Sequence, residues 1–392
     1  MRLAQAARNM LEQNLIPFWA ALRDDENGGF YGYMDFDLNL DKRAVKGCIL
    51  NSRILWFFSE AAIVTHSGIA RVCADHAWQF LRDHFVDRKN GGLYWSVTYD
   101  GKPQDTTKHT YNQAFGVYAL SSYYRLTGDR HALWEAQLLF ELIEKHCTDT
   151  GGYLEAFGVD WEPIENDKLS ENNVLAERTM NTLLHVFEGY SGLYFAVPND
   201  QVRAALLRML DIYENRVFDP TRNRQRVFFD KEYNELIDLY SYGHDIESSW
   251  LIDWGCGLLG DPTLAKRIGR INNRLAENIY QIAYRNHSVM NECENGRVDD
   301  TRVWWVQAEA VLGFINAHSK TGDRKYLDAA KDVWRYINDI MIDRRPGGEW
   351  FWDVDAQGQP VSCKPIVEPW KCPYHNGRMC MELMRRNPDV EV

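Results

Sequence analysis

The chain has 392 residues, of which 45% are hydrophobic and 26% are charged, a composition typical of a soluble globular protein with a large core. Its formal net charge of −12 argues against a nucleic-acid partner, because a polyanion needs a basic face and the sequence has no cluster of Lys and Arg. No stretch approaches the roughly 20 apolar residues of a membrane span. No apolar signal segment follows Met1, and the eight cysteines are scattered. We therefore expect a cytoplasmic protein with reduced thiols and with no membrane or nucleic-acid partner.

Apolar residues recur at helical spacing along nearly the whole chain. Leu3, Ala7, Met10 and Leu11 begin the pattern, and Pro17 predicts a kink or break in the first helix. In chain order the spacing predicts twelve helices, at residues 2–22, 45–65, 69–85, 108–126, 129–146, 172–196, 199–216, 244–259, 262–284, 301–319, 323–342 and 373–386. The sequence thus predicts an all-α protein.

The connections between these helices are alternately long and short. Long connections follow the odd-numbered helices and carry glycine pairs that predict hairpin turns, as in Asn27-Gly28-Gly29-Phe30 and Asn90-Gly91-Gly92-Leu93. Short connections follow the even-numbered helices, and aspartates recur there about every 60 residues, at Asp129, Asp200, Asp261 and Asp323. This alternation indicates an internal repeat of helix pairs.

Short links make neighbouring helices antiparallel, and six such pairs can close into a double ring. We therefore expect a single domain over residues 1–392, an (α/α)6 barrel of twelve helices with short β-hairpins in the long loops at one end. The even-numbered helices are the more continuously apolar and would form the inner ring. Their N-termini converge at the long-loop end, where they would favour an anionic ligand or intermediate. Because such a barrel closes on itself, we expect a monomer.

Polar residues near the starts of the inner helices indicate chemistry at that end. His244 and Glu247 lie one turn apart on a helix. They could form half of a metal site or a structural hydrogen-bonded pair, but we favour an acid–base role for His244, with Glu247 orienting its ring. His375 is an acid–base candidate or a helix cap. Arg53 either faces a ligand or forms an internal ion pair with Glu309.

The types of ionisable residue favour one reaction over another. Glycoside hydrolases also use (α/α)6 barrels and need two carboxylates, for which Asp245, Glu247 and Glu309 are candidates. Two histidines and an arginine fit proton transfer next to a carbonyl better, because an imidazole with a pKa of about 6.5 can take or give a proton near neutrality.

Several long strings resemble the cellobiose 2-epimerases of the N-acylglucosamine 2-epimerase superfamily over essentially the whole chain. They include Ser52-Arg53-Ile54-Leu55-Trp56-Phe57, Met180-Asn181-Thr182, Gly243-His244-Asp245-Ile246-Glu247-Ser248-Ser249-Trp250, Trp304-Trp305 and Trp370-Lys371-Cys372-Pro373-Tyr374-His375-Asn376. The resemblance implies catalytic roles for Arg53, His244, Glu247 and His375. It also implies that the sugar is bound by Asn181, His185, Trp250, Trp305 and Glu309, and we add Tyr111 from its place on an inner helix and Trp370 as an aromatic platform.

The resemblance also implies an activity. It is the reversible inversion of C2 in the reducing-end sugar of a β-1,4-linked disaccharide such as cellobiose, lactose or mannobiose, without a cofactor or a metal. The alternatives are an aldose–ketose isomerase acting on mannose or glucose, an N-acylglucosamine 2-epimerase, and a non-catalytic sugar-binding protein with the same barrel.

Overall fold

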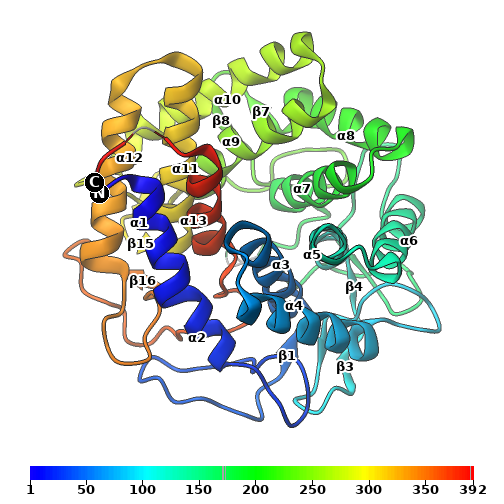
Figure 1. Cartoon of the computed structure of the whole chain (residues 1–392). Coiled ribbons are helices and arrows are strands. Elements are labelled where there is room, and N and C mark those ends of the chain that lie inside the picture. The colour runs from blue at the N-terminus through cyan, green and yellow to red at the C-terminus, as the bar shows by residue number, and fades with distance from the viewer. Residues whose placement is uncertain (170–171, 173, 389) are drawn as a thin grey trace.

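Two concentric rings of helices make up the protein, whose computed structural model describes residues 1–169, 172, 174–388 and 390–392 (Figure 1). The inner ring consists of α3 (Cys48–Thr65), α5 (Thr110–Thr127), α7 (Met180–Ala196), α9 (Tyr242–Leu259), α11 (Trp304–Thr321) and α13 (Tyr374–Arg386). Each of these helices contacts the next, and α13 contacts α3, so the ring closes. The expected (α/α)6 barrel is confirmed.

The outer ring covers the inner one. It consists of α1 (Leu3–Met10) with α2 (Ile16–Ala21), α4 (Gly68–Phe80), α6 (Arg130–His146), α8 (Asp200–Ile212), α10 (Pro262–Ile282) and α12 (Arg324–Tyr336). π-Helical turns extend three of these helices, at Leu81–Phe85, Tyr213–Val217 and Ile337–Met341. A fourth, Leu11–Leu15, joins α1 to α2, so the chain is helical from Leu3 to Ala21 and the expected break at Pro17 does not occur; Pro17 directly follows this π-helical turn.

Burial distinguishes the two rings. In α3, 15 of 18 residues are buried, whereas in α12 only 5 of 13 are buried, because an inner helix has neighbours on every side. The helix α3 is long and apolar enough to cross a membrane, with a mean hydropathy of 1.2, but 83% of it is buried inside the barrel. Its apolar residues are therefore those of a core helix.

The short connections lie at one end of the barrel and follow a common pattern. The inner helices α5, α9 and α11 end at Gly128, Gly260 and Gly322, which have positive φ angles that favour glycine. The next residue, an aspartate, caps the outer helix that follows, as Asp129 caps α6. One recurring aspartate departs from this pattern, because Asn199 rather than Asp200 caps α8.

Short antiparallel strand pairs link the long connections at the other end. The strand before an inner helix pairs with a strand of the next long connection: β1 (Lys46–Gly47) with β2 (Ser96–Val97), β4 (Lys108–His109) with β5 (Ala156–Phe157), β6 (Arg178–Thr179) with β9 (Phe228–Phe229), β10 (Leu239–Ser241) with β13 (Glu292–Glu294), and β15 (Arg302–Val303) with β16 (Asp353–Val354). The remaining strands are β3 (Pro103–Asp105), β7 (Phe218–Asp219), β8 (Arg224–Gln225), β11 (Tyr284–Arg285), β12 (Ser288–Val289) and β14 (Arg297–Asp299). A bridge between Met34 and Val367 joins the last connection to the first.

These pairings fix the inner helices where they begin. The backbone N–H of Cys48, the first residue of α3, donates to the carbonyl of Trp95, and the first residues of α5, α7, α9 and α11 make the equivalent bond. These N–H groups are therefore already used, which removes part of the expected attraction for an anion. The predicted helix 172–196 begins only at Met180, because β6 takes residues 178–179; residue 173, within that prediction, lies outside the described residues.

Buried ion pairs hold the same end together. The Lys46 ammonium lies 2.7 Å from Asp24, and Lys108 lies 2.9 Å from Asp87. Each aspartate also accepts backbone N–H groups of its own glycine-containing turn, so its buried charge is stabilised by more than the lysine. The strand before each of these inner helices is thus attached to the turn after the preceding outer helix.

Candidate active site

A cavity of about 400 Å³ opens at the long-connection end of the inner ring. Most of the predicted site residues line it: Arg53, Tyr111, Asn181, His185, His244, Glu247, Trp305, Trp370 and His375. They come from all six inner helices or the residues just before them, so only the closed ring brings them together. Trp250 and Glu309 do not line the cavity.

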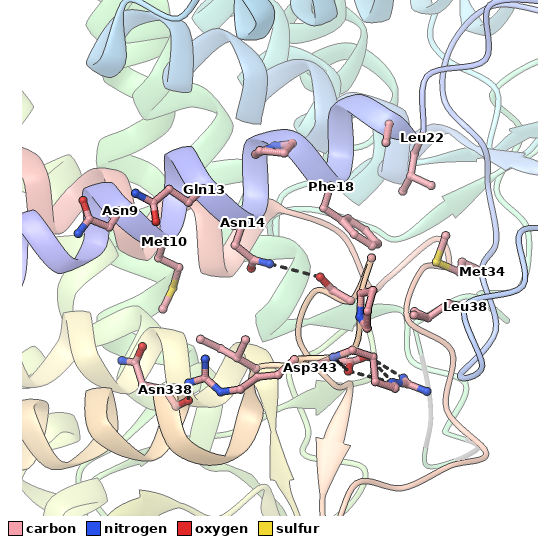
Figure 2. A pocket seen from close by; sticks show the side chains of 18 of the residues that line it. Asn9, Met10, Gln13, Asn14, Phe18, Leu22, Met34, Leu38, Asn338 and Asp343 are labelled. Atoms are coloured by element: carbon pink, nitrogen blue, oxygen red, sulfur yellow. Dashed lines mark hydrogen bonds and ion pairs between the residues drawn. The ribbon is translucent and has the colours of Figure 1, made fainter.

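A larger hollow, of about 920 Å³, lies elsewhere, between α1–α2 and the chain that follows α12 (Figure 2). Figure 2 shows Asn9, Gln13 and Asn14 on one side and Asn338 and Asp343 on the other. Its lining includes no histidine or glutamate, and Asp343 is paired with Arg345 at 2.6 Å. Of these two hollows, only the smaller one is lined by histidines and glutamates among the described residues.

His375 is held by a carboxylate behind the cavity wall. Its Nδ1 lies 2.8 Å from Oε1 of Glu309, and the indole N–H of Trp250 donates to Oε2 of Glu309 at 2.8 Å. The expectation that Glu309 and Trp250 bind the sugar stays a prediction; in this structure neither lines the cavity, and their bonds support His375. The helix-cap alternative for His375 is wrong, since its side chain bonds to Glu309.

His244 has a different partner. Its Nδ1 lies 2.7 Å from the hydroxyl oxygen of Ser241, the last residue of β10. The expectation that Glu247 orients His244 is wrong, because the Glu247 carboxylate turns to Arg378 instead. The i, i+3 spacing placed both side chains on one face of α9 but did not determine what each would bond.

Trp305 lies against both imidazoles. Its ring centroid is 4.8 Å from that of His244 and 5.3 Å from that of His375. Gly243 makes this arrangement possible, since a Cβ atom at that position would lie 2.3 Å from the Trp305 ring. The two histidines are thus neighbours on the wall of one cavity.

Arg53 is buried and forms no ion pair with a described carboxylate. Its guanidinium donates to the Tyr111 hydroxyl at 2.7 Å and lies over the rings of Phe115 and Tyr374, at 4.2 and 4.7 Å from their centroids. The alternative of an internal Arg53–Glu309 ion pair is therefore wrong. Arg53 is left with positive charge facing the cavity, as an anionic intermediate requires.

Arg378 is a site residue that sequence reasoning missed. It is 2% exposed and donates to three carboxylates, Glu188, Glu247 and Glu309. The family-like sequence string that contains His375 stops just before Arg378. The signal that could have identified Arg378 was its charge, one turn after His375 on an inner helix. Its role could not be predicted because its partners come from α7, α9 and α11.

Glu188 extends this network to a third histidine. Its carboxylate accepts a hydrogen bond from Nδ1 of His185 at 2.8 Å and another from the Tyr374 hydroxyl. Burial opposes ionisation of Glu188, but the Arg378 charge and the His185 hydrogen bond outweigh it and lower its pKa to about 2. Glu188 is therefore ionised at neutral pH.

All three histidines of the cavity are neutral at neutral pH. Burial lowers the pKa of His244 to about 3, and the pKa of His375 falls well below its usual range through burial and the nearby Arg378 charge. Burial also lowers the pKa of His185. A neutral imidazole has a free lone pair, so each can act as a base.

Glu247, Glu309 and His375 could in principle hold a cation, since one ligand atom of each lies within 4.8 Å of the others. Arg378 already donates to both carboxylates, and Nδ1 of His375 is bonded to Glu309. A guanidinium therefore already occupies the place of a cation between the two carboxylates, and the cluster does not fit a metal.

Residues outside the inner helices add aromatic and charged side chains to the lining of the cavity. Trp352 and Trp370 line it together with Lys168, Asp353 and Lys364. His109, to which sequence reasoning gave no role, bonds to Asn166 at 3.1 Å and so anchors the connection that carries Lys168.

The chain is similar over nearly its whole length to proteins named as sugar epimerases. The chain is 48% identical to a cellobiose 2-epimerase of Eubacterium cellulosolvens over 97% of its length and 98% of that protein, and 49% identical to one of Ruminococcus albus over 98% of each. The crystal structure of a sugar epimerase from a ruminal bacterium superposes with a TM-score of 0.98, at 48% identity, covering 99% of this chain and 100% of that one.

The family model for N-acylglucosamine 2-epimerase (GlcNAc 2-epimerase) matches residues 28–376. This match spans the long connections and the cavity residues on α3, α5, α7, α9 and α11, and it ends two residues before Arg378. The chain therefore belongs to the N-acylglucosamine 2-epimerase family.

Proposed function

We propose that the protein is a cellobiose 2-epimerase, which reversibly inverts C2 of the reducing-end sugar of a β-1,4-linked disaccharide. The observation that carries this proposal is the meeting of two neutral imidazoles, His244 and His375, with the unpaired Arg53 guanidinium in one cavity. The names of the similar proteins support the choice of a disaccharide.

The bonds of the sugar dictate the order of steps. C2 of a closed pyranose is not acidic, so the ring must open first: the C1–O5 bond breaks, O5 takes a proton, and O1 loses one as the C1 carbonyl forms. A base then removes the C2 proton, and the electron pair moves through C1=C2 to O1, giving an enediolate. A proton returned to the opposite face of C2 restores the carbonyl and inverts the centre.

The partners of the two imidazoles suggest how they divide the work. An ionised Glu309 can only accept, so Nδ1 of His375 carries the proton and Nε2 keeps a lone pair for the substrate. The Ser241 hydroxyl can donate or accept, so His244 can adopt either tautomer. His375 is therefore poised as a base, and His244 can begin as acid or base.

The cationic side of the cavity stabilises the intermediate. The enediolate oxygen carries negative charge that the sugar lacks, so a fixed cation lowers the barrier more than it strengthens substrate binding. Arg53 supplies this charge, and its contacts with Tyr111, Phe115 and Tyr374 hold it in place before the substrate arrives.

Trp370 is our choice for the wall that holds the second sugar. It precedes α13 in the chain and lines the cavity, with its ring centroid 5.9 Å from that of Tyr111. Aromatic faces pack well against the C–H faces of sugars. If Trp370→Ala impairs turnover of a free hexose as much as that of cellobiose, Trp370 contacts the reacting ring instead.

Product analysis tests the proposal. The protein is incubated with cellobiose and, separately, with mannose in D2O, and the products are identified by NMR. We expect cellobiose to yield its C2 epimer, glucosylmannose, with deuterium at C2. A ketose from mannose with cellobiose unchanged would indicate an aldose–ketose isomerase, and no product from either sugar would contradict an epimerase.

A further inference from the structure

Arg378 is surrounded by more negative charge than it can balance. Its Nη1 donates to Glu188 and its Nη2 to both Glu247 and Glu309, and all three glutamates are buried. One oxygen of Glu247 and one of Glu309 lie within 4.8 Å of each other. Two buried carboxylates that share one cation at this distance do not both ionise easily, so one of them tends to keep a proton.

The hydrogen bonds show which carboxyl keeps it. Both oxygens of Glu188 accept hydrogen bonds, from Arg378, His185 and Tyr374. Both oxygens of Glu309 also accept, from Arg378, His375 and Trp250. This pattern favours the ionised form of each.

Glu247 is different. Its Oε1 accepts from Arg378, but its Oε2 is buried and has no hydrogen-bond partner among the described residues. The side chain lines the cavity, so Oε2 is the only one of these six oxygens that is left for a ligand. A protonated Oε2 would be satisfied by an acceptor on that ligand.

We propose that Glu247 is held as a neutral carboxylic acid whose hydroxyl, on Oε2, donates a hydrogen bond to an oxygen of the bound sugar. This inference rests on the proposed epimerase function. A neutral donor suits the chemistry, because a carboxylate beside the enediolate would repel it, whereas an acid held neutral stabilises its oxygen. Arg378 is then the positioning residue that keeps Glu188 and Glu309 ionised and leaves the proton on Glu247.

The surroundings of Glu247 agree with a raised pKa. Burial and the charge of Glu309 raise it to about 8, against the opposing effect of Arg378. Burial raises the pKa of Glu309 as well, but hydrogen bonds from Arg378 and Trp250 oppose that rise. The ionisable groups around Glu247 are His244 on its own helix and, from the other inner helices, Arg53, Tyr111, His185, Glu188, Glu309, Tyr374, His375 and Arg378.

Infrared spectroscopy of the substrate-free protein tests the protonation state directly. At pH 7 the wild type should show a carbonyl band of a neutral carboxylic acid that is absent from Glu247→Gln and that fades as the pH rises through about 8. Glu155 is also buried, with a pKa raised to about 8, but it lies outside the cavity, so Glu155→Gln is the matched control. The carboxylic-acid band of Glu155 should remain in the Glu247→Gln variant.

Kinetics test the role. If Glu247 is a neutral donor, the amide of Glu247→Gln replaces it, and kcat/KM stays within about 10-fold of the wild type, whereas Glu247→Ala loses about 100-fold. The wild-type kcat/KM should fall above pH 8 because the donor is lost, and Glu247→Gln should lack this fall while Glu155→Gln keeps it.

The opposite results would overturn the inference. An inactive but folded Glu247→Gln, with wild-type kcat/KM rising through the pKa of Glu247, would make Glu247 an ionised base. Should Glu247→Gln fail to fold, the wild-type pH profile and band titration still decide between the two states. A neutral band in a protein that does not epimerise would support the neutral acid while contradicting the proposed function, so the two failures are distinguishable.

Discussion

His375 and His244 line one cavity and both contact Trp305, yet their Nδ1 atoms meet different partners. The Nδ1 atom of His375 is bonded to Glu309, a carboxylate that also accepts hydrogen bonds from Arg378 and Trp250. The Nδ1 atom of His244 is bonded to the Ser241 hydroxyl. A carboxylate fixes one tautomer and one ring orientation, whereas a hydroxyl permits both tautomers. Two imidazoles that look equivalent in the sequence thus differ in how firmly their tautomers are fixed, and we propose that this difference divides the proton transfers between them.

Removing either imidazole is expected to have the largest effect. His375→Phe and His244→Phe should each lower kcat/KM by about 10²–10⁴-fold, the usual contribution of general acid–base catalysis. Exchange of the C2 hydrogen with D2O, followed by NMR, should disappear in both. Exchange that persists in both variants would exclude these histidines as the acid–base pair.

Removing the Nδ1 partner of each histidine tests whether the two partners differ in their importance for catalysis. Glu309→Gln removes a charged hydrogen bond and should lower kcat/KM by about 10–100-fold, whereas Ser241→Ala removes a neutral one and should lower it by only about 2–10-fold. Thermal unfolding of both variants controls for stability, because Glu309 also binds Arg378. Equal effects on the two folded variants would mean that the partner of Nδ1 does not matter.

The pH dependence on the acid side tests whether both bases are neutral. An ordinary histidine protonates at a pH of about 6.5. Burial lowers the pKa of His244 to about 3 and that of His375 well below its usual range, so kcat/KM should stay nearly constant from pH 7 to about pH 5. A fall centred at about pH 6.5 would contradict this expectation.

Stability should respond to the same groups over a different pH range. Because these histidines bind protons in the unfolded chain at about pH 6.5 but not in the folded one, the free energy of unfolding should decrease as the pH falls below about 6.5. Melting temperatures measured beside the initial rates separate this loss from any loss of catalysis.

The smallest effect is expected far from both imidazoles, at the short-connection end. Asp129 caps α6 through bonds to the backbone N–H groups of His131 and Ala132, so Asp129→Ala should reduce the free energy of unfolding by about 1 kcal/mol. It should leave kcat/KM unchanged, since Asp129 is not in the cavity. Chemical denaturation and steady-state kinetics measure the two quantities, and a change in kcat/KM would show coupling between the two ends.

Local patterns in the sequence were sufficient to predict the barrel. The barrel depends on local features: glycines with positive φ angles, capping residues such as Asp129, and continuously apolar inner helices. Each involves only neighbouring residues, so each can be recognised in the sequence. They also place polar residues such as Arg53, His244 and His375 near the starts of inner helices, from which a shared cavity could be predicted.

The partners of those residues depend on the closed ring. Glu188 and Arg378 are 190 positions apart, and Glu247 and Arg378 are 131 apart, so no local spacing relates them. The expected pairs, Glu247 with His244 and Glu309 with Arg53, were reasonable guesses from proximity on a helix or from charge. Closure of the inner ring instead brings three glutamates, from α7, α9 and α11, to one guanidinium on α13.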